Sequence, residues 1–203
     1  MSPAQAEPVL REYAQILATD GVERGLIGPR EAPRLWERHI MNCVVVADRD
    51  AGLVPADASV IDVGSGAGLP GIVWAIVRPD LRMTLLEPLL RRATFLEEVC
   101  QRLQLGHVTV VRGRAEQAEG LTADIVTARA VAPLERLLGW VFPLVATGGQ
   151  VVALKGQGAA VEIEAARTAG FGGDFEVIRC GAGVVEPPTT VVRIRGLTRS
   201  RTA

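Results

Sequence analysis

The chain has 203 residues, of which 48% are hydrophobic and 22% charged, and its formal net charge is −1. This composition fits a globular protein with one well-buried domain and room for a small appendage. A membrane helix needs about 18 apolar residues in succession, and no such run occurs. The near-zero charge also lacks the basic footprint typical of nucleic-acid-binding proteins.

The N-terminus reads MSPAQAEPVLREYA and has no basic segment followed by an apolar core. No secretory signal is therefore expected, and we place the protein in the cytoplasm. The cysteines Cys43, Cys100 and Cys180 are too far apart for a zinc site or a disulfide framework, so we expect each to be a small buried apolar residue in a reducing compartment. His39 and His107 are isolated, and no metal site is predicted.

Residues 4–18, 33–43 and 44–51 carry apolar side chains at helical spacing and predict a helical cap spanning residues 1–56. Strand and helix patterns then alternate through residues 57–203, which indicates an α/β domain whose mostly parallel, seven-stranded sheet has helices on both faces. Predicted strands lie near 59–63, 83–87, 108–112, 124–128, 149–155, 177–179 and 190–194. Predicted helices lie near 70–78, 90–104, 133–144 and 158–169.

The first predicted strand ends in Asp62 and runs into a turn that contains Gly64, Gly66 and Gly68 before Leu69. Glycine permits positive φ and close approach of a ligand to the main chain. The next helix directs free N–H groups and its positive end at an anionic group. A dinucleotide fingerprint has glycine where Leu69 stands. The D-x-G-x-G-x-G spacing is instead typical of S-adenosylmethionine sites, and we expect all five residues to contribute to cofactor binding, unless the turn is purely structural.

The second predicted strand closes with Glu87, about 20 residues after the glycines. A carboxylate at this place can accept hydrogen bonds from both ribose hydroxyls of a nucleoside. The alternative is a solvated acid at a strand end. Because Glu87 occurs together with the glycine turn, we favour the ribose role.

Two later loops complete the predicted site. The loop after the third strand contains Ala115 and Glu116, and Glu116 can either read an adenine edge or serve as a charge at a helix N-terminus. The loop after the fourth strand contains Arg129, which stays protonated and cannot act as a general base. An acceptor atom that needs no base, such as purine N7, suits this residue. The alternative is an Arg paired with a strand-end acid.

The basic residues are mostly arginine, and Lys155, the single lysine, ends the fifth predicted strand. A phosphate contact and a solvated strand-end charge are both compatible with that position. Arginine binds phosphate bidentately. The arginines form local clusters, of which the last makes the C-terminal tail basic: Arg91 and Arg92, Arg112 and Arg114, and Arg193, Arg195, Arg199 and Arg201.

Several blocks together resemble the bacterial 16S ribosomal RNA guanine-N7 methyltransferases, the glucose-inhibited division protein B family. The blocks are Glu37-Arg38-His39-Ile40, DVGSGAGLPGI from Asp62, LLEP before Leu89, RRATFL from Arg91, Arg114-Ala115-Glu116, ARAVA from Ala128 and ALKG around Lys155. The resemblance implies a Rossmann-like class I methyltransferase fold. It also implies S-adenosylmethionine as methyl donor and N7 of one guanine in 16S rRNA as acceptor.

In that family the positions matching Gly64, Leu69, Ala115, Glu116 and Arg129 contact S-adenosylmethionine. The resemblance thus implies a cofactor role for Arg129 in addition to its catalytic one. The near-neutral charge suggests limited affinity for naked RNA, so the expected partner is the assembled 30S subunit, with the enzyme a monomer and no membrane involved.

Three other functions were weighed. A methyltransferase of small molecules or proteins would show transfer that does not fall steeply with salt. An NAD-dependent oxidoreductase is disfavoured by Leu69 and by the absence of a proton-relay set, since the single tyrosine, Tyr13, lies in the cap. A non-catalytic protein of the same fold would bind S-adenosylmethionine and ribosomal particles without turnover.

Overall fold

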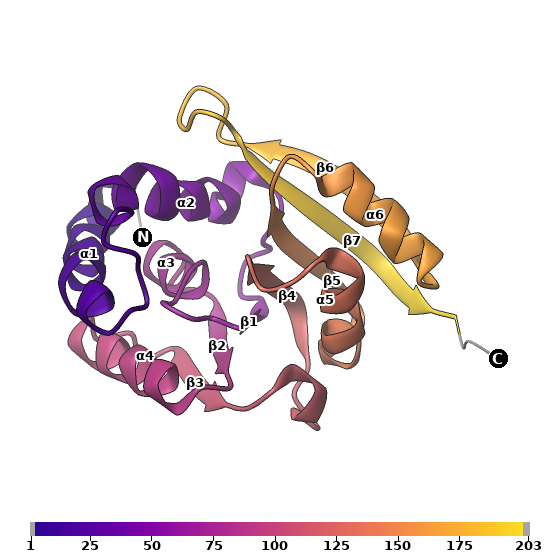
Figure 1. Cartoon of the computed structure of the whole chain (residues 1–203), viewed down its shortest axis with the longest axis horizontal. Helices are drawn as coiled ribbons and strands as arrows, with labels where there is room; N and C mark the ends of the chain where they lie inside the picture. The colour runs from indigo at the N-terminus through magenta and orange to yellow at the C-terminus, as the bar shows by residue number, and fades with distance from the viewer. Residues whose placement is uncertain (1–2, 201–203) are drawn as a thin grey trace.

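The computed structural model describes residues 3–200 and has a central sheet flanked by helices (Figure 1). Seven strands form this sheet in the order β3-β2-β1-β4-β5-β7-β6. Neighbouring strands from β3 across to β5 run parallel, and β7 runs antiparallel to both β5 and β6. The prediction of a mostly parallel seven-stranded sheet is confirmed.

The strands are β1 (Ser59–Val63), β2 (Arg82–Glu87), β3 (Val108–Arg112), β4 (Ala123–Arg129), β5 (Val145–Lys155), β6 (Phe171–Cys180) and β7 (Thr189–Arg199). The α-helices are α1 (Pro3–Ile16), α2 (Met41–Ala47), α3 (Gly71–Val77), α4 (Leu90–Arg102), α5 (Leu134–Val141) and α6 (Ala159–Thr168). Short π or 3-10 helices are η1 (Leu17–Gly21), η2 (Ala32–Arg34), η3 (Leu35–Ile40), η4 (Arg49–Ala51), η5 (Ala115–Gln117) and η6 (Phe142–Leu144).

The predicted elements all occur, but several boundaries were wrong. The expected boundary between residues 43 and 44 is absent, because α2 spans both residues, and β5 begins at Val145 instead of residue 149. The last two strands are much longer than predicted. They pair with each other in a hairpin in which Gly172, Gly173 and Asp174 lie within β6. Such residues are poor strand formers, so their pairing depends on the neighbouring strand β7 and is not visible in local sequence.

Two hydrophobic cores cover the two faces of the sheet. Successive side chains of a strand point to opposite faces, so Val60 belongs to one core and Ile61 to the other. Helices α1 to α4 lie on the first face, and α5 and α6 lie on the second (Figure 1). Asp62 follows the same alternation and points from β1 to the first face, toward the start of α3.

The N-terminal segment is packed into the first core. Tyr13, Ile16 and Leu17 are buried in the same cluster as Trp74 of α3. The indole N–H of Trp74 donates to the carbonyl of Cys43 at 3.1 Å. The division into residues 1–56 and 57–203 stays a prediction, although these contacts join the two parts through shared apolar surface.

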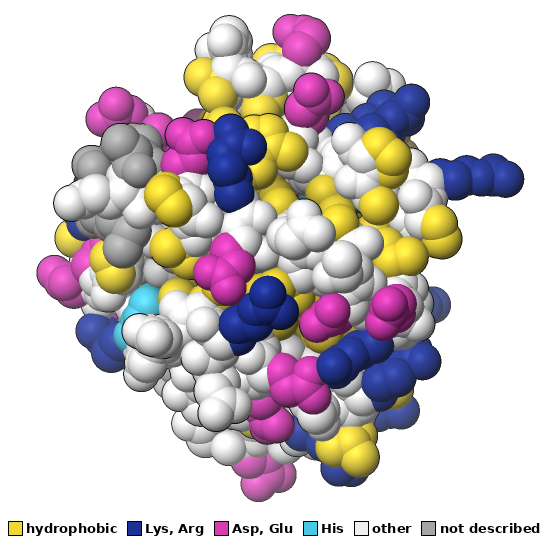
Figure 2. Space-filling view, turned by 90° about the vertical axis from the view of Figure 1, so that its left-hand side faces the viewer, with side chains coloured by type: hydrophobic (Ala, Val, Ile, Leu, Met, Phe, Trp, Pro, Cys, Tyr) yellow, Lys and Arg dark blue, Asp and Glu magenta, His cyan; other side chains and the backbone are white. Residues whose placement is uncertain are grey.

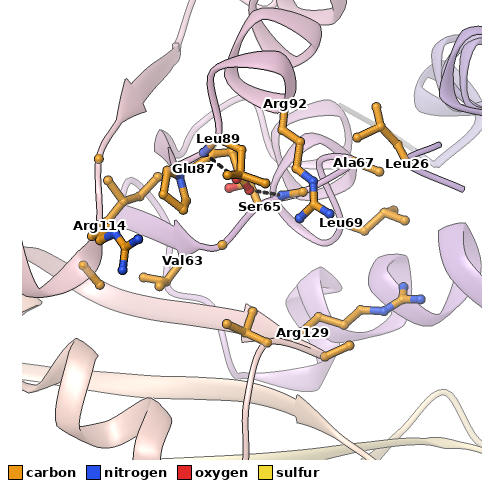
Figure 3. Close-up of a pocket in the computed structure, with 18 of the residues that line it drawn as sticks. Leu26, Val63, Ser65, Ala67, Leu69, Glu87, Leu89, Arg92, Arg114 and Arg129 are labelled. Atoms are coloured by element: carbon orange, nitrogen blue, oxygen red, sulfur yellow. Dashed lines mark hydrogen bonds between the residues drawn. The ribbon is translucent and has the colours of Figure 1, made fainter. Parts of the chain in front are cut away.

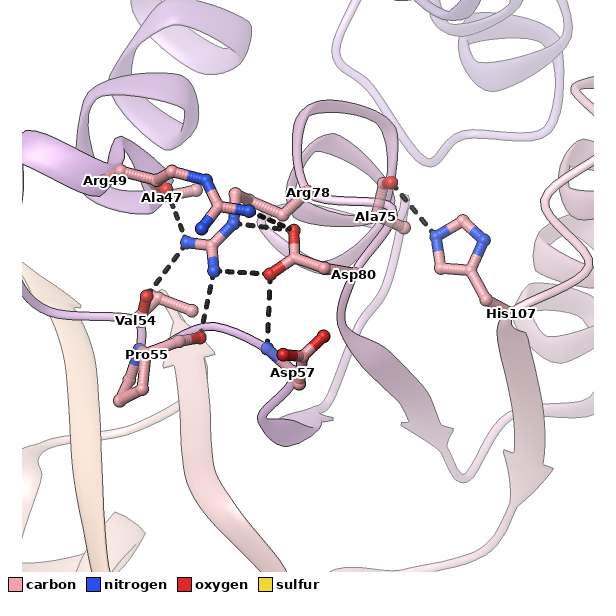
Figure 4. A network of polar contacts seen from close by, with 9 residues as sticks. All are labelled: Ala47, Arg49, Val54, Pro55, Asp57, Ala75, Arg78, Asp80 and His107. Atoms are coloured by element: carbon pink, nitrogen blue, oxygen red, sulfur yellow. Dashed lines mark hydrogen bonds and ion pairs between the residues drawn. The ribbon is translucent and has the colours of Figure 1, made fainter. Parts of the chain in front are cut away.

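A buried arginine fixes the connection between the N-terminal segment and the sheet (Figure 4). Arg78, 3% exposed, donates to the carbonyls of Ala47, Val54 and Pro55 at 3.2, 2.8 and 2.9 Å. It also donates to both oxygens of Asp80, and these bonds hold the pKa of that carboxyl well below its usual range. These three carbonyls therefore have a donor close to the point where the chain enters β1.

Within residues 3–200 no helix combines the length and the apolar character that crossing a membrane requires.

Candidate functional site

The glycine turn after β1 has three residues with positive φ: 67° at Gly64, 59° at Gly66 and 94° at Gly68. Amide N–H groups anchor it to β2, because Gly64 donates to the carbonyl of Leu86 at 2.8 Å and Gly66 donates to Glu87 Oε2 at 2.9 Å. A methyl group added at Gly66 would have only the Gly64 carbonyl oxygen, at 3.7 Å, within 4 Å. This part of the turn therefore exposes its backbone to open space.

The other two glycines of the run serve packing. A Cβ at Gly68 would lie 2.5 Å from Ile72 Cγ1 and 2.8 Å from the Tyr13 hydroxyl. One at Gly71 would lie 2.3 Å from Leu85 Cδ2 and 2.6 Å from Asp62 Oδ2. Gly71 thus allows α3 to approach the sheet closely, the role that the third glycine has in a dinucleotide fingerprint. The sequence contained this signal, because Gly71 belongs to the same run, but it was not among the predicted site residues.

A first cavity of about 640 Å³ lies at the carboxyl edge of the sheet above this turn (Figure 3). Its volume is in the range of pockets that hold cofactors. The predicted residues that line it are Gly64, Gly66, Leu69, Glu87, Ala115, Glu116 and Arg129. Asp62 and Gly68 are not among its lining residues. The structure thus gathers seven of the predicted residues around one space and places two behind it.

Asp62 is completely buried behind the turn. Its Oδ2 accepts the amide N–H of Gly71 at 3.0 Å, and its Oδ1 has no hydrogen-bond partner within residues 3–200. Burial is the main cause that raises its pKa to about 7. Asp62 therefore fixes the first turn of α3 from behind the glycine turn.

Glu87 ends β2 and is buried beside the first cavity. Its Oε2 accepts from Gly66, and its Oε1 accepts the amide N–H of Leu89 at 3.0 Å. A carboxylate has about four acceptor positions, so two bonds leave capacity for hydroxyl donors. The alternative of a solvated acid does not describe this residue, which is 1% exposed.

Arg129 ends β4 and lies across the first cavity from Glu87 (Figure 3). Its guanidinium donates to Nδ1 of His39, to the carbonyl of His39 at 3.3 Å and to Sγ of Cys43 at 3.4 Å. The alternative of an ion pair with a strand-end acid was wrong, because all three acceptors belong to the N-terminal segment and none is a carboxylate. The sequence indicated His39 only as an isolated histidine and as part of the resemblance, and its contact with Arg129, 90 residues away, had no local signal.

Of the two expectations for Lys155, that of a solvated strand-end charge was wrong, and that of a phosphate contact stays a prediction. Its side chain is 9% exposed, and its ammonium donates to the carbonyl of Ala132 at 2.8 Å and to Glu162 Oε2 at 2.7 Å. The same Glu162 oxygen accepts the amide N–H of Leu134 at 2.8 Å. Lys155 therefore holds the loop after β4 in place and is not a solvated charge.

A second, larger cavity of about 1320 Å³ adjoins the first. Trp36, Arg38 and Asn42 line it from the N-terminal segment, and the segment from Val184 to Thr190 lines it from the other side. His39, Arg129, Ala130 and Val131 line both cavities and so form their common wall.

Surface arginines differ in whether they have ion-pair partners. Basic and acidic side chains are interspersed on the face that Figure 2 shows. Arg24 pairs with Glu98 of α4 at 2.6 Å. The C-terminal arginines are also engaged, since Arg193 pairs with Glu176, Arg195 pairs with Asp174, and Arg199 lies over the ring of Phe171. Arg201 lies outside the described residues. Within the predicted basic tail, the charges of Arg193 and Arg195 are thus compensated by acidic partners. Arg38, Arg92 and Arg114, in contrast, line the cavities with no ion pair among residues 3–200.

Solved structures with similar folds include MtNAS in complex with MTA and tNA, with a TM-score of 0.60, 19% identity, and coverage of 93% of this chain and 70% of that one. A predicted O-methyltransferase from Agrobacterium tumefaciens has a TM-score of 0.58 and 21% identity, covering 80% and 82%. At such low sequence identity these similarities show the fold alone. They confirm the predicted class I methyltransferase architecture.

Sequence relatives are much closer. The chain is 58% identical over 191 residues to the ribosomal RNA small subunit methyltransferase G of Thermobifida fusca (strain YX), covering 92% of this chain and 79% of the relative. It is also 58% identical over 196 residues to the protein of that name from Salinispora arenicola (strain CNS-205), covering 90% and 78%. The model of the rRNA small subunit methyltransferase G family matches residues 6–179. This chain belongs to the rRNA small subunit methyltransferase G family.

Proposed function

We propose that this protein transfers a methyl group from S-adenosylmethionine to N7 of a specific guanine in the 16S rRNA of the small ribosomal subunit. The observation that carries the proposal is the pair of cavities with a common wall at the carboxyl edge of the sheet, in a chain of this family. The first cavity has the features of a nucleoside cofactor site, and the second, with about twice the volume, is large enough for part of a large acceptor.

The first cavity fits S-adenosylmethionine on three counts. The backbone at Gly66 faces open space. Glu87 has spare acceptor positions for a ribose diol, and Ala115 and Glu116 of η5 lie at the same cavity for an adenine ring. When bound, the cofactor supplies a methyl group that is already activated on a sulfonium. Asp62, Gly64, Gly68 and Leu69 complete the proposed cofactor site, with Asp62 and Gly68 acting from behind the turn.

The common wall fits an acceptor atom that has no proton to lose. Arg129 is permanently protonated. His39 has both ring nitrogens engaged, Nδ1 with Arg129 and Nε2 with Glu31 at 3.1 Å. Neither group can take up a proton in this arrangement. Guanine N7 has a free lone pair and needs no base, so holding it in line with the methyl group is most of the task, and such positioning contributes roughly 7–11 kcal/mol.

We place the acceptor guanine in the second cavity, where Arg129 reaches it from the wall. Arg38 lines that cavity without an ion pair in the described chain and is available for an RNA phosphate. With a net charge of −1 and many neutralised arginines, the protein gains little from naked RNA. We therefore favour the assembled 30S subunit as substrate and a cytoplasmic monomer as the acting form.

The test is incubation with methyl-labelled S-adenosylmethionine and 30S subunits whose 16S rRNA has no 7-methylguanosine, followed by nucleoside mass spectrometry. We expect label in 7-methylguanosine from 16S rRNA. Label in another nucleoside or in ribosomal protein would overturn the proposal that guanine N7 is the methyl acceptor. Intact cofactor binding without any transfer would favour a non-catalytic role.

A further inference from the structure

Arg129 is oriented by the N-terminal segment and not by the sheet that carries it. It ends β4, yet its three acceptors are His39 Nδ1, the His39 carbonyl and Cys43 Sγ, from η3 and α2. An arginine has five N–H donors in a planar fork, and a set of acceptors on one side of it fixes the plane. The acceptors on His39 and Cys43 therefore determine the orientation of the guanidinium toward the two cavities.

The bond from Arg129 to His39 requires a particular state of the imidazole. The guanidinium only donates, so Nδ1 must carry a lone pair, and the ring proton is then on Nε2, 3.1 Å from Glu31 Oε2. Glu31 orients the ring in the way that carboxylates orient functional histidines. The ring is therefore neutral and held from both sides.

We infer that His39 is a positioning residue for methyl transfer, whose neutral imidazole holds the Arg129 guanidinium at the wall between the two cavities. The inference rests on the proposed function. His39 need not touch the cofactor or the base. Its contribution is to present Arg129 in one orientation, and losing that orientation misplaces a group at the reacting centre.

The charges around the imidazole support the neutral state. Burial lowers the pKa of His39, and the adjacent positive charge of Arg129 lowers it further. Glu31 acts in the opposite direction, and Arg38 on the same short helix adds to the lowering. Cys43 from α2 is a neutral thiol, because burial raises its pKa. Protonation of His39 would put two cations in contact and remove the acceptor, so activity depends on pH through this pair.

Two variants of His39 separate positioning from packing. Asparagine has a neutral oxygen close to the place of Nδ1 and can accept from Arg129, whereas alanine cannot. We expect His39→Ala to lower kcat by roughly 10²-fold, the scale of a misplacement of about 1 Å. His39→Asn should recover most of this loss. It should also abolish the fall in kcat at acidic pH, because its amide does not titrate.

The other histidine provides the matched control. His107 is half-buried, contacts the carbonyl of Ala75 at 3.0 Å and lines neither cavity. His107→Asn should have the same kcat as the natural protein and the same fall in kcat at acidic pH, called the acidic limb below. Cofactor affinity and melting temperature are measured for all three variants, so that loss of fold is recognised separately.

The outcomes distinguish the inference from the proposed function. If the natural protein forms no 7-methylguanosine on 30S subunits, the proposed function fails. If it does so and folded His39→Ala keeps the natural kcat, the inference fails. It also fails if His39→Asn is as defective as His39→Ala, or keeps the acidic limb of the natural protein.

Discussion

Alanine substitutions at two neighbouring glycines separate ligand approach from packing in the turn after β1. Gly66 and Gly68 both have positive φ, 59° and 94°. Placing alanine in such a conformation costs about 1–2 kcal/mol. The surroundings differ, because a Cβ at Gly66 meets open space, whereas one at Gly68 overlaps Ile72 and the Tyr13 hydroxyl.

The expected stabilities follow from this difference. Gly66→Ala should lower the free energy of unfolding by the backbone cost alone, about 1–2 kcal/mol. Gly68→Ala adds overpacking of about 1–3 kcal/mol in the first core, for a total of about 2–5 kcal/mol. Urea unfolding followed by tryptophan fluorescence measures both values, and an unchanged slope with urea would exclude a change in the unfolded state.

Cofactor affinity should change in the opposite order. Gly66 lines the first cavity and Gly68 does not. Gly66→Ala should therefore weaken S-adenosylmethionine binding at least tenfold, about 1.4 kcal/mol, while folded Gly68→Ala should lose less. Isothermal titration well below the melting temperature gives the two affinities. If Gly66→Ala bound S-adenosylmethionine as tightly as the natural protein, or if Gly68→Ala were as stable as the natural protein, the roles assigned to the two glycines would be refuted.

Three further predictions concern single residues. Tyr13→Phe removes the bond from the Tyr13 hydroxyl to the Ala67 carbonyl, 2.6 Å long, and should cost about 1–3 kcal/mol in urea unfolding; a change below about 0.5 kcal/mol would contradict it. Because the pKa of Asp62 is raised from 3.8 to about 7, the folded state binds its proton more tightly, and stability from this group is lost as pH rises from 4 to 7. Asp62→Asn should remove that loss of stability, about 4 kcal/mol. An identical pH dependence of the free energy of unfolding in the variant and the natural protein would contradict the raised pKa of Asp62. Arg38→Gln should reduce the slope of log affinity for 30S subunits against log salt by about 1, whereas ion-paired Arg195→Gln should change it less, and equal slopes in the two variants would remove Arg38 from the RNA contact.

Much of the fold could be predicted because its signals are local. The run from Asp62 to Gly71 contains the strand end, the positive-φ positions and the close helix approach in ten consecutive residues. The acidic residue Glu87 follows at a spacing that parallel neighbouring strands impose. Each of these features depends on short-range geometry, so the sequence predicted Gly64, Gly66, Leu69 and Glu87 among the residues that line the first cavity.

The parts that were missed depend on contacts between distant segments. Lys155 looks like a free strand-end charge until Glu162, one helical turn into α6, is brought against it. Arg193 and Arg195 look basic until β6 pairs with β7 and supplies their acidic partners. The contact of Arg129 with His39 joins β4 to the N-terminal segment. Charge in a sequence is therefore a poor guide to free charge on a surface, because pairing is decided by tertiary structure.

The central claim is that N7 of a guanine accepts the methyl group, and replacement of that atom tests it most directly. Small subunits are reconstituted from 16S rRNA transcripts made either with guanosine or with 7-deazaguanosine, in which a carbon replaces N7. Both are incubated with the enzyme and methyl-labelled S-adenosylmethionine. We predict label in the guanosine particles and none in the 7-deazaguanosine particles, with a mixture of the two labelled as fully as its guanosine content allows. Undiminished transfer to the 7-deazaguanosine particles would contradict the account, because the acceptor would then be a different atom.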